Sequence, residues 1–286
     1  MAEVSRETTK STETAESIRA IREQPNLLAS IHNRLWNLES ESIKAVLLDK
    51  DGTLLDFNRM WGFWTDKVIR LFHFRLADHG CSISQEDIPH IWGTIHDEQG
   101  HMIDYDARGP LAMGTMDEVY AVLIWHGYRA GLSWAVSKAI VHGCIQEANL
   151  AMEHARPAYP LLGVREFLDQ CREKGIRLGV VTADDTDSAR KHLEWMGMVD
   201  YFEVIVGNDR VLQGKPFADM ILLACEELGI TPDQTAVIGD TNGDMQMARA
   251  ADCAIAIGIG TGVASQSADA VIFSFTQLLE HEGVQE

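Results

Sequence analysis

The fold is decided by an eight-residue stretch, Val46-Leu47-Leu48-Asp49-Lys50-Asp51-Gly52-Thr53, in which two carboxylates stand where an apolar run ends and a turn begins. The run Ala45–Leu48 predicts a buried strand, and Gly52-Thr53 breaks it. Strand alternation puts Asp49 and Asp51 on one side of the backbone at the strand's carboxyl end, the edge at which open α/β sheets bind ligands. Because adjacent acids repel, the pair indicates a bound cation or a retained proton. The alternative is an ordinary turn with a solvated acid.

Two further strands are predicted to end in polar side chains. The run Ile176–Val181 predicts a strand that leads into the hydroxyl of Thr182, followed by Ala183-Asp184-Asp185, which can open a helix. A hydroxyl and backbone donors at such a junction suit a phosphate oxygen. Thr235–Ile238 predicts another strand, which leads into Gly239-Asp240. Acids therefore gather at strand ends again.

A lysine and a further acid lie beside predicted helices. Lys215, in Gly214-Lys215-Pro216, comes just before an apolar pattern that predicts a helix over Phe217–Leu228, with Gly229 as its stop. Asp244 follows Asp240 four residues later. An acid at that place can bind a metal, or it can stabilise the amino end of a helix.

The chain resembles the haloacid dehalogenase superfamily, and within it the phosphoglycolate-phosphatase-like branch, through four segments in the same order. These are Asp49-Lys50-Asp51-Gly52-Thr53, then Thr182, then Lys215-Pro216, then Gly239-Asp240-Thr241-Asn242-Gly243-Asp244. The resemblance runs from about Ile43 to Leu279. Relatives frequently carry a further proline where this chain has Phe217-Ala218, which affects the detail of that turn but not the lysine.

The resemblance implies roles for these residues in phosphoryl transfer through an aspartyl-phosphate. Such a transfer needs an ionised carboxylate in line with phosphorus, a cation and an acid for the leaving oxygen. Asp49 would be the nucleophile, and Asp51 would protonate the leaving alcohol and then deprotonate the attacking water. Thr182 and Lys215 would hold the phosphoryl oxygens.

The resemblance also implies a magnesium site. Its ligands would be Asp49, the backbone carbonyl of Asp51, and Asp240, with Asp244 bound directly or through water. An oxygen-only set of this kind suits Mg²⁺ and not zinc.

Composition limits the classes of partner. The chain has 286 residues, 46% of them hydrophobic, and a formal net charge of −19. This charge argues against a nucleic-acid partner, which needs a basic face. A small phosphorylated metabolite remains compatible, because Mg²⁺ and Lys215 make a local positive site. We find no apolar stretch long enough to span a bilayer and no signal-peptide core, so the expected location is cytoplasmic and no membrane partner is predicted.

The cysteines and the amino-terminal extension add two further expectations. Five scattered cysteines without a Cys-x-x-Cys pair indicate reduced thiols. Residues 1–42 form an amino-terminal extension, predicted to be disordered over residues 1–14 and helical after that. It is expected to pack against the body of the enzyme, with a homodimer contact or a regulatory extension as the alternatives.

The remaining chain divides into a core and an insert. We expect a doubly wound α/β core with a parallel sheet over residues 43–56 and 161–286, and an all-helical cap over residues 57–160. Six segments are predicted to form most of the sheet: Ile43–Leu48, Ile176–Val181, Phe202–Val206, Thr235–Ile238, Ala254–Ile257 and Ala270–Phe273. Cap helices are predicted at Trp61–Leu76, Met116–His126 and Leu132–Met152. Their tryptophans Trp61, Trp64, Trp125 and Trp134 are expected in the cap core.

One segment of the cap is polar. Gly100–Pro110 separates apolar helices and carries a single arginine, Arg108. We hypothesise that this segment faces the active site and that Arg108 binds an anionic group of the substrate. The alternative is a surface loop.

The function expected from these residues is magnesium-dependent hydrolysis of a small phosphomonoester, with phosphoglycolate as the first candidate substrate. A phosphosugar mutase of the β-phosphoglucomutase type uses the same two aspartates and is the nearest alternative. A catalytically silent binding protein with this fold is a third. Relatives that cleave carbon–halogen bonds lack the second aspartate, so Asp51 argues against that chemistry.

Overall fold

The computed structural model describes residues 25–36, 43–264 and 267–280. Six parallel strands form its main sheet, in the order β5-β4-β1-β6-β7-β8. Their bounds are β1 (Ala45–Leu48), β4 (Arg177–Val181), β5 (Val204–Val206), β6 (Thr235–Gly239), β7 (Ile255–Ile259) and β8 (Ala270–Ile272). The predicted α/β core is therefore confirmed, and each of the six predicted strands is present with slightly shifted ends.

Strand β1 lies at the centre of this sheet. It pairs with β4 on one side and β6 on the other, so that Leu48 is in register with both Val180 and Ile238. All four residues of β1 are buried. A parallel strand covered on both faces reads as a continuous apolar run, which explains why Ala45–Leu48 shows no alternation.

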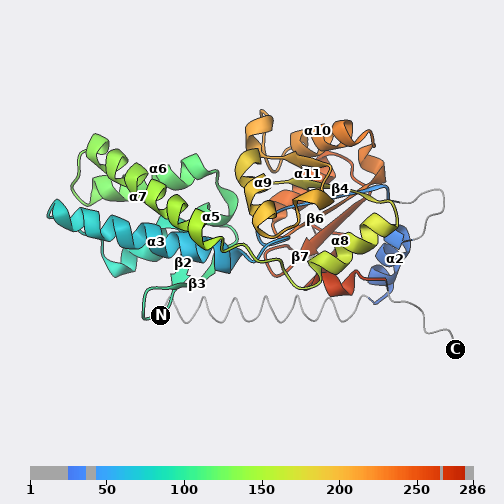
Figure 1. Cartoon of the computed structure of the whole chain (residues 1–286), viewed down its shortest axis with the longest axis horizontal. Coiled ribbons are helices and arrows are strands. Elements are labelled where there is room, and N and C mark those ends of the chain that lie inside the picture. Colours follow the sequence, from blue (N-terminus) through green and yellow to red (C-terminus); the bar gives the residue numbers. More distant parts are fainter. Residues whose placement is uncertain (1–24, 37–42, 265–266, 281–286) are drawn as a thin grey trace. The chain divides into compact units, whose positions relative to one another are not determined.

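Helices cover both faces of the sheet (Figure 1), with α10 (Asp219–Leu228) and α11 (Asn242–Ala250) on one face and α8 (Val164–Glu173) on the other. Helix α10 ends at Gly229, whose φ of 63° is the left-handed conformation that glycine adopts without strain. The core on the side of α10 and α11 contains Leu47, Val181, Val206, Met220, Ile221, Leu228, Val237, Met245 and Ala248. This packing fixes the strand ends from which the polar residues project.

The described part of the amino-terminal extension is helix α2 (Pro25–Trp36). Its residues Ile31, Leu35 and Trp36 are buried. The indole Nε1 of Trp36 donates a hydrogen bond to the carbonyl of Leu278 at 2.8 Å, and its ring meets that of Phe167 edge-on at 5.7 Å. Helix α2 thus packs on the sheet unit, whereas the disorder predicted for residues 1–14 lies outside the described residues.

A second compact unit comprises residues 55–159 and 187–197. Its helices are α3 (Phe57–Asp78), α4 (Ile88–Trp92), α5 (Pro110–Met113), α6 (Met116–Arg129), α7 (Trp134–Ala155) and most of α9 (Thr186–Trp195). The predicted helical insert is confirmed, with one addition. Strands β2 (Thr94–His96) and β3 (Met102–Tyr105) form an antiparallel hairpin, partly inside the stretch predicted as a polar loop. These strands are short and their register shifts between Ile95 and His96, so no alternating pattern marks them in the sequence.

The four tryptophans expected in the cap core divide into two pairs. Trp61 and Trp64 are buried as predicted, but the prediction is wrong for Trp125 and Trp134, each of which is 50% exposed. Their rings gather around that of Tyr128, at centroid distances of 5.7 Å and 6.2 Å. Helical spacing shows which apolar residues share a stripe, but these rings lie beside the stripe and contact each other instead.

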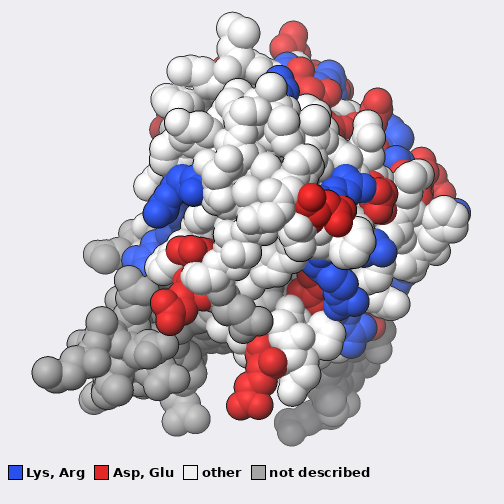
Figure 2. Space-filling view, turned by 90° about the vertical axis from the view of Figure 1, so that its left-hand side faces the viewer, with Lys and Arg blue, Asp and Glu red and all other residues white. Residues whose placement is uncertain are grey.

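The surface combines charged and uncharged areas. On the face drawn in Figure 2, acidic and basic side chains lie scattered around a broad uncharged area.

Among the described residues, no helix combines the length and the apolar character that crossing a bilayer requires. All five cysteines lie in the described part of the chain and are free thiols, in agreement with their scattered spacing.

Candidate active site at the carboxyl edge of the sheet

Asp49 is the first residue after β1 and lies at the centre of a polar cluster. Its backbone N–H donates to the carbonyl of Ile238 at 2.9 Å, which extends the sheet pairing by one residue. The side chain is buried, and its Oδ1 accepts from Nζ of Lys215 at 2.5 Å. The acid after the first strand and the lysine before α10 are therefore in direct contact, although far apart in sequence.

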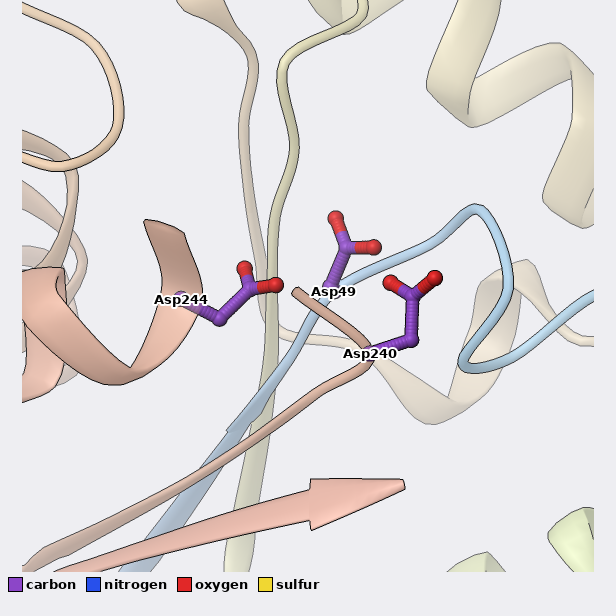
Figure 3. A group of neighbouring side chains, drawn as sticks. All are labelled: Asp49, Asp240 and Asp244. Carbon is purple, nitrogen blue, oxygen red and sulfur yellow. The ribbon is translucent and has the colours of Figure 1, made fainter. Parts of the chain in front are cut away.

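Three carboxylates meet at this edge, from Asp49, Asp240 and Asp244 (Figure 3). Each contributes an oxygen, and these oxygens lie within 4.8 Å of one another. Among the described residues, the buried Oδ1 of Asp240 has no hydrogen-bond partner. Buried oxygens in such a group need a positive partner, and a carboxylate-only donor set suits Mg²⁺. The residues present thus fit a divalent cation.

Gly52 makes room for this arrangement. Its φ is +74°, and a Cβ placed there would lie 2.2 Å from Oδ2 of Asp240. Any side chain would therefore both strain the backbone and displace that carboxylate. Asp240, which follows β6, therefore requires a glycine at position 52.

Asp244 stabilises the amino end of a helix, one of its two expected roles, and it also reaches the polar cluster. Its Oδ2 accepts from the backbone N–H and the hydroxyl of Thr241, at 3.1 Å and 2.6 Å, which closes a capping box at the start of α11. Its Oδ1 lies 2.7 Å from Nζ of Lys215. One oxygen stabilises the helix, and the other faces the polar cluster.

Burial and mutual repulsion dominate the electrostatics of the cluster. Burial, followed by the charges of Asp244 and Asp51, raises the pKa of Asp49 to about 7, although Lys215 acts to lower it. Burial and the charges of Asp49 and Asp244 likewise raise the pKa of Asp240 well above its usual range. Burial alone would lower the pKa of Lys215, but Asp244 and Asp49 outweigh it and raise that pKa. The cluster therefore brings together more carboxyl groups than its one lysine can pair with, and their ionised forms are disfavoured.

A second group of charges lies beside the first. Nζ of Lys50 lies 2.5 Å from Oδ2 of Asp51 and 3.2 Å from Oδ2 of Asp184, and the lysine side chain is fully buried. Burial opposes the charge of Lys50, yet the two carboxylates outweigh it and raise its pKa. Burial raises the pKa of Asp184 to about 6 against the opposing effect of Lys50. The sequence analysis gave neither Lys50 nor Asp184 a catalytic role, although a lysine between two aspartates directly after a buried strand was the available signal.

The other predicted residues fall in different places. Thr182 is buried at the end of β4, and its Oγ1 accepts from the backbone N–H of Asp184 at 3.2 Å. Arg108 belongs to the other unit, where its side chain is 84% exposed and lies 3.5 Å from Oδ1 of Asp106. The sheet edge thus brings together the acids with Lys215, and Arg108 stays outside that cluster.

Solved structures with the same fold include several with phosphate-related names. A predicted phosphoglycolate phosphatase from Haemophilus somnus 129PT aligns with a TM-score of 0.60 at 18% identity, over 84% of this chain and 97% of that one. A putative β-phosphoglucomutase from Thermotoga maritima aligns with a TM-score of 0.57 at 18% identity, over 82% of this chain and 96% of that one. At such identities the likeness shows the fold alone.

Curated relatives are more similar in sequence but over shorter stretches. A phosphoglycolate phosphatase of Salmonella paratyphi A is 33% identical over 127 residues, 42% of this chain and 50% of the relative. That of Escherichia coli K12 is 39% identical over 90 residues, 32% of this chain and 36% of the relative. The chain thus spans half or less of the length of these relatives.

Family membership rests on a longer match. Residues 43–252 match the haloacid dehalogenase-like hydrolases. This range includes β1, the helical insert and the six residues of the sheet unit that were predicted to form the site: Asp49, Asp51, Thr182, Lys215, Asp240 and Asp244. The order of the strands, the acids at their ends and this match agree with one another. The chain belongs to the haloacid dehalogenase-like hydrolase family.

Proposed function

We propose that this chain is a magnesium-dependent phosphomonoester hydrolase that acts through an aspartyl-phosphate at Asp49. The observation that carries the proposal is the contact of Lys215 with both Asp49 and Asp244, beside Asp240, in one buried cluster. Phosphoryl transfer through an aspartyl-phosphate needs a carboxylate nucleophile and fixed positive charge around the phosphoryl oxygens. A family whose curated relatives include phosphatases supports the same class of reaction.

The chain's own residues supply each step of this reaction. A carboxylate oxygen of Asp49 forms a bond to phosphorus while the bond from phosphorus to the leaving alcohol breaks, and Asp51 gives that alcohol oxygen a proton. A water molecule then attacks the phosphoryl group on Asp49, and Asp51 takes up its proton as phosphate leaves. Lys215 and Thr182 bind the phosphoryl oxygens during both transfers.

The cation would be held by Asp49, the backbone carbonyl of Asp51, Asp240 and Asp244. When bound there, Mg²⁺ supplies positive charge that offsets the excess of carboxylates and lets an anionic phosphate approach. Asp240 is the ligand best suited to it, because its Oδ1 is buried without a hydrogen-bond partner among the described residues.

Phosphoglycolate is the first candidate substrate, because the curated relatives named above carry that activity in their names. A phosphosugar mutase is the second candidate, since a solved structure of this fold carries that name. The two differ in product: the hydrolase releases free phosphate, and the mutase yields an isomeric sugar phosphate.

The test is release of free phosphate from a panel of phosphoglycolate, sugar phosphates and nucleoside monophosphates, with Mg²⁺ or with a chelator. We expect Mg²⁺-dependent release that falls roughly a thousandfold or more in Asp49→Asn, because the nucleophile is lost. A matched control is Asp200→Asn, an exposed acid of the sheet unit, which should leave the rate unchanged. Release that persists in Asp49→Asn, or no turnover of any compound, would exclude the proposed hydrolase.

A further inference from the structure

Lys50 is a charged side chain that is fully buried at the carboxyl edge of the sheet. It directly follows Asp49. A buried ammonium is costly unless carboxylates surround it, and here two do so. Apolar residues of similar volume would stabilise the fold at least as well as such a buried ion group. Stability alone therefore does not explain a lysine at this position.

The two partners of Lys50 come from different loops at the carboxyl edge of the sheet. Asp51 lies in the loop after β1, and Asp184 lies in the loop after β4. These strands are neighbours, with Leu48 in register with Val180, so their loops leave the sheet side by side. Lys50 joins the two loops through contacts of 2.5 Å to Asp51 and 3.2 Å to Asp184.

The connection continues to the residue proposed to bind phosphoryl oxygens. The backbone N–H of Asp184 donates to Oγ1 of Thr182 at 3.2 Å. A continuous series of contacts therefore runs from Asp51 through Lys50 and Asp184 to Thr182. At its ends lie the proposed proton donor and a proposed ligand of the phosphoryl group.

We propose that Lys50 is a positioning residue, which holds the carboxylate of Asp51 in the orientation for proton transfer and fixes its loop against that of Thr182. This inference rests on the proposed function. Lys50 itself touches no reacting atom in this scheme and acts through Asp51. Displacing a catalytic group by about 1 Å costs roughly a hundredfold in rate. A contribution of this size to the rate would explain why a charged lysine is kept at a buried position.

The test compares two kinds of leaving group. Nitrophenolate leaves without a proton, whereas an alkoxide needs one from Asp51. We therefore compare kcat/KM for p-nitrophenyl phosphate with kcat/KM for the best alkyl phosphate of the panel, because kcat/KM reports only the steps up to release of the alcohol. In Lys50→Met we expect a loss of roughly ten- to a hundredfold for the alkyl phosphate and of less than about threefold for the aryl phosphate.

Three further variants fix the interpretation. Asp51→Asn should show the same selectivity more strongly. Asp184→Asn keeps the contact between Lys50 and Asp51 and should show this selective loss more weakly. If Lys50→Met does not fold, the Asp184→Asn variant tests the positioning role instead. The control is Lys174→Met, which changes the lysine that caps the carboxyl end of α8 and pairs with Glu280, and it should change neither rate.

The outcomes separate this inference from the proposed function. If the wild-type enzyme hydrolyses neither compound with Mg²⁺, the proposed function fails. If the wild-type enzyme is active but Lys50→Met and Asp184→Asn reduce both rates equally, or reduce neither, Lys50 is not a positioning residue.

Discussion

Two lysines lie at the same edge of the sheet, each between two aspartates, and the side chain of Lys50 is fully buried whereas that of Lys215 is 11% exposed. Lys215 contacts Asp49 and Asp244 at 2.5 Å and 2.7 Å, and Lys50 contacts Asp51 and Asp184 at 2.5 Å and 3.2 Å. The surroundings differ, because Lys215 has a third carboxylate, Asp240, in its cluster, whereas Lys50 is fully buried beside two carboxylates. The excess of negative charge therefore lies around Lys215. We infer that this excess, and not the presence of a buried lysine, marks the place of a cation and of the reaction.

The largest expected effect is on stability at the enclosed lysine. Lys50→Met should lower the free energy of unfolding by about 3–5 kcal/mol, because it leaves two carboxylates without their buried partner. Urea unfolding would measure this loss. The double variant Lys50→Met with Asp184→Leu should recover at least half of it, since only the partly exposed carboxylate of Asp51 has then lost its contact with the lysine. No recovery would mean that the two residues do not form one ion group.

The second effect separates the two lysines by their response to metal. Lys215→Met should lower kcat by roughly a hundred- to a thousandfold, because a positive group on the phosphoryl oxygens is lost. Its thermal stability should nevertheless rise on addition of Mg²⁺ more than that of the wild type, since the cation can take the place of the ammonium among three carboxylates. Lys50→Met should show no such additional gain. Equal gains in both variants would contradict the difference drawn between the clusters.

The third prediction concerns protons at the cluster of Lys215. Burial and neighbouring acids raise the pKa of Asp49 to about 7, so Asp49 takes up a proton as the pH falls through 7. A proton on a ligand competes with the metal, so the apparent dissociation constant of Mg²⁺ should rise by up to about tenfold per pH unit below 7 and level off above it. Calorimetric titration of the wild-type enzyme at pH 6 and pH 8 measures this change. An affinity that is equal at both values would contradict the raised pKa.

The smallest effect is expected at Arg108, outside both clusters. If its guanidinium binds an anionic group of the substrate, Arg108→Ala should raise KM by tenfold or less and leave kcat unchanged, as loss of uniform binding does. Steady-state kinetics on the best substrate are the measurement, and Arg129→Ala on α6 provides a control arginine in the same unit. Unchanged KM would leave Arg108 as a surface residue paired with Asp106.

Of the two lysines, Lys215 was predicted from the sequence to belong to the site, whereas Lys50 was not. The six strands were predictable because parallel strands buried on both faces appear as apolar runs, and the residues after them then meet at one edge. Asp49 and Asp240 are brought together in this way, and Asp244 on α11 and Lys215 before α10 join them. Their catalytic and metal-binding roles stay predictions until the kinetic tests are made.

Other features depend on contacts that no local pattern encodes. The pairing of Lys50 with Asp184 joins two loops that are distant in sequence, and neither residue follows a recognised spacing. The exposure of Trp125 and Trp134 depends on which surface each helix leaves uncovered, and helical periodicity does not specify it. The hairpin of β2 and β3 escapes detection because its strands are shorter than a reliable alternation requires.

The central place of β1 in the sheet affects how the chain folds during synthesis on the ribosome. Ala45 pairs with Arg177 and Thr235, so the strand that carries Asp49 emerges long before either of its neighbours. At synthesis rates of about 5–20 residues per second, this strand waits on the order of ten seconds for a partner. Most residues of the helical unit are contiguous in sequence and become available during that interval. A nascent chain stalled before residue 177 would therefore expose the unpaired apolar strand, which makes this interval the time of greatest need for a chaperone.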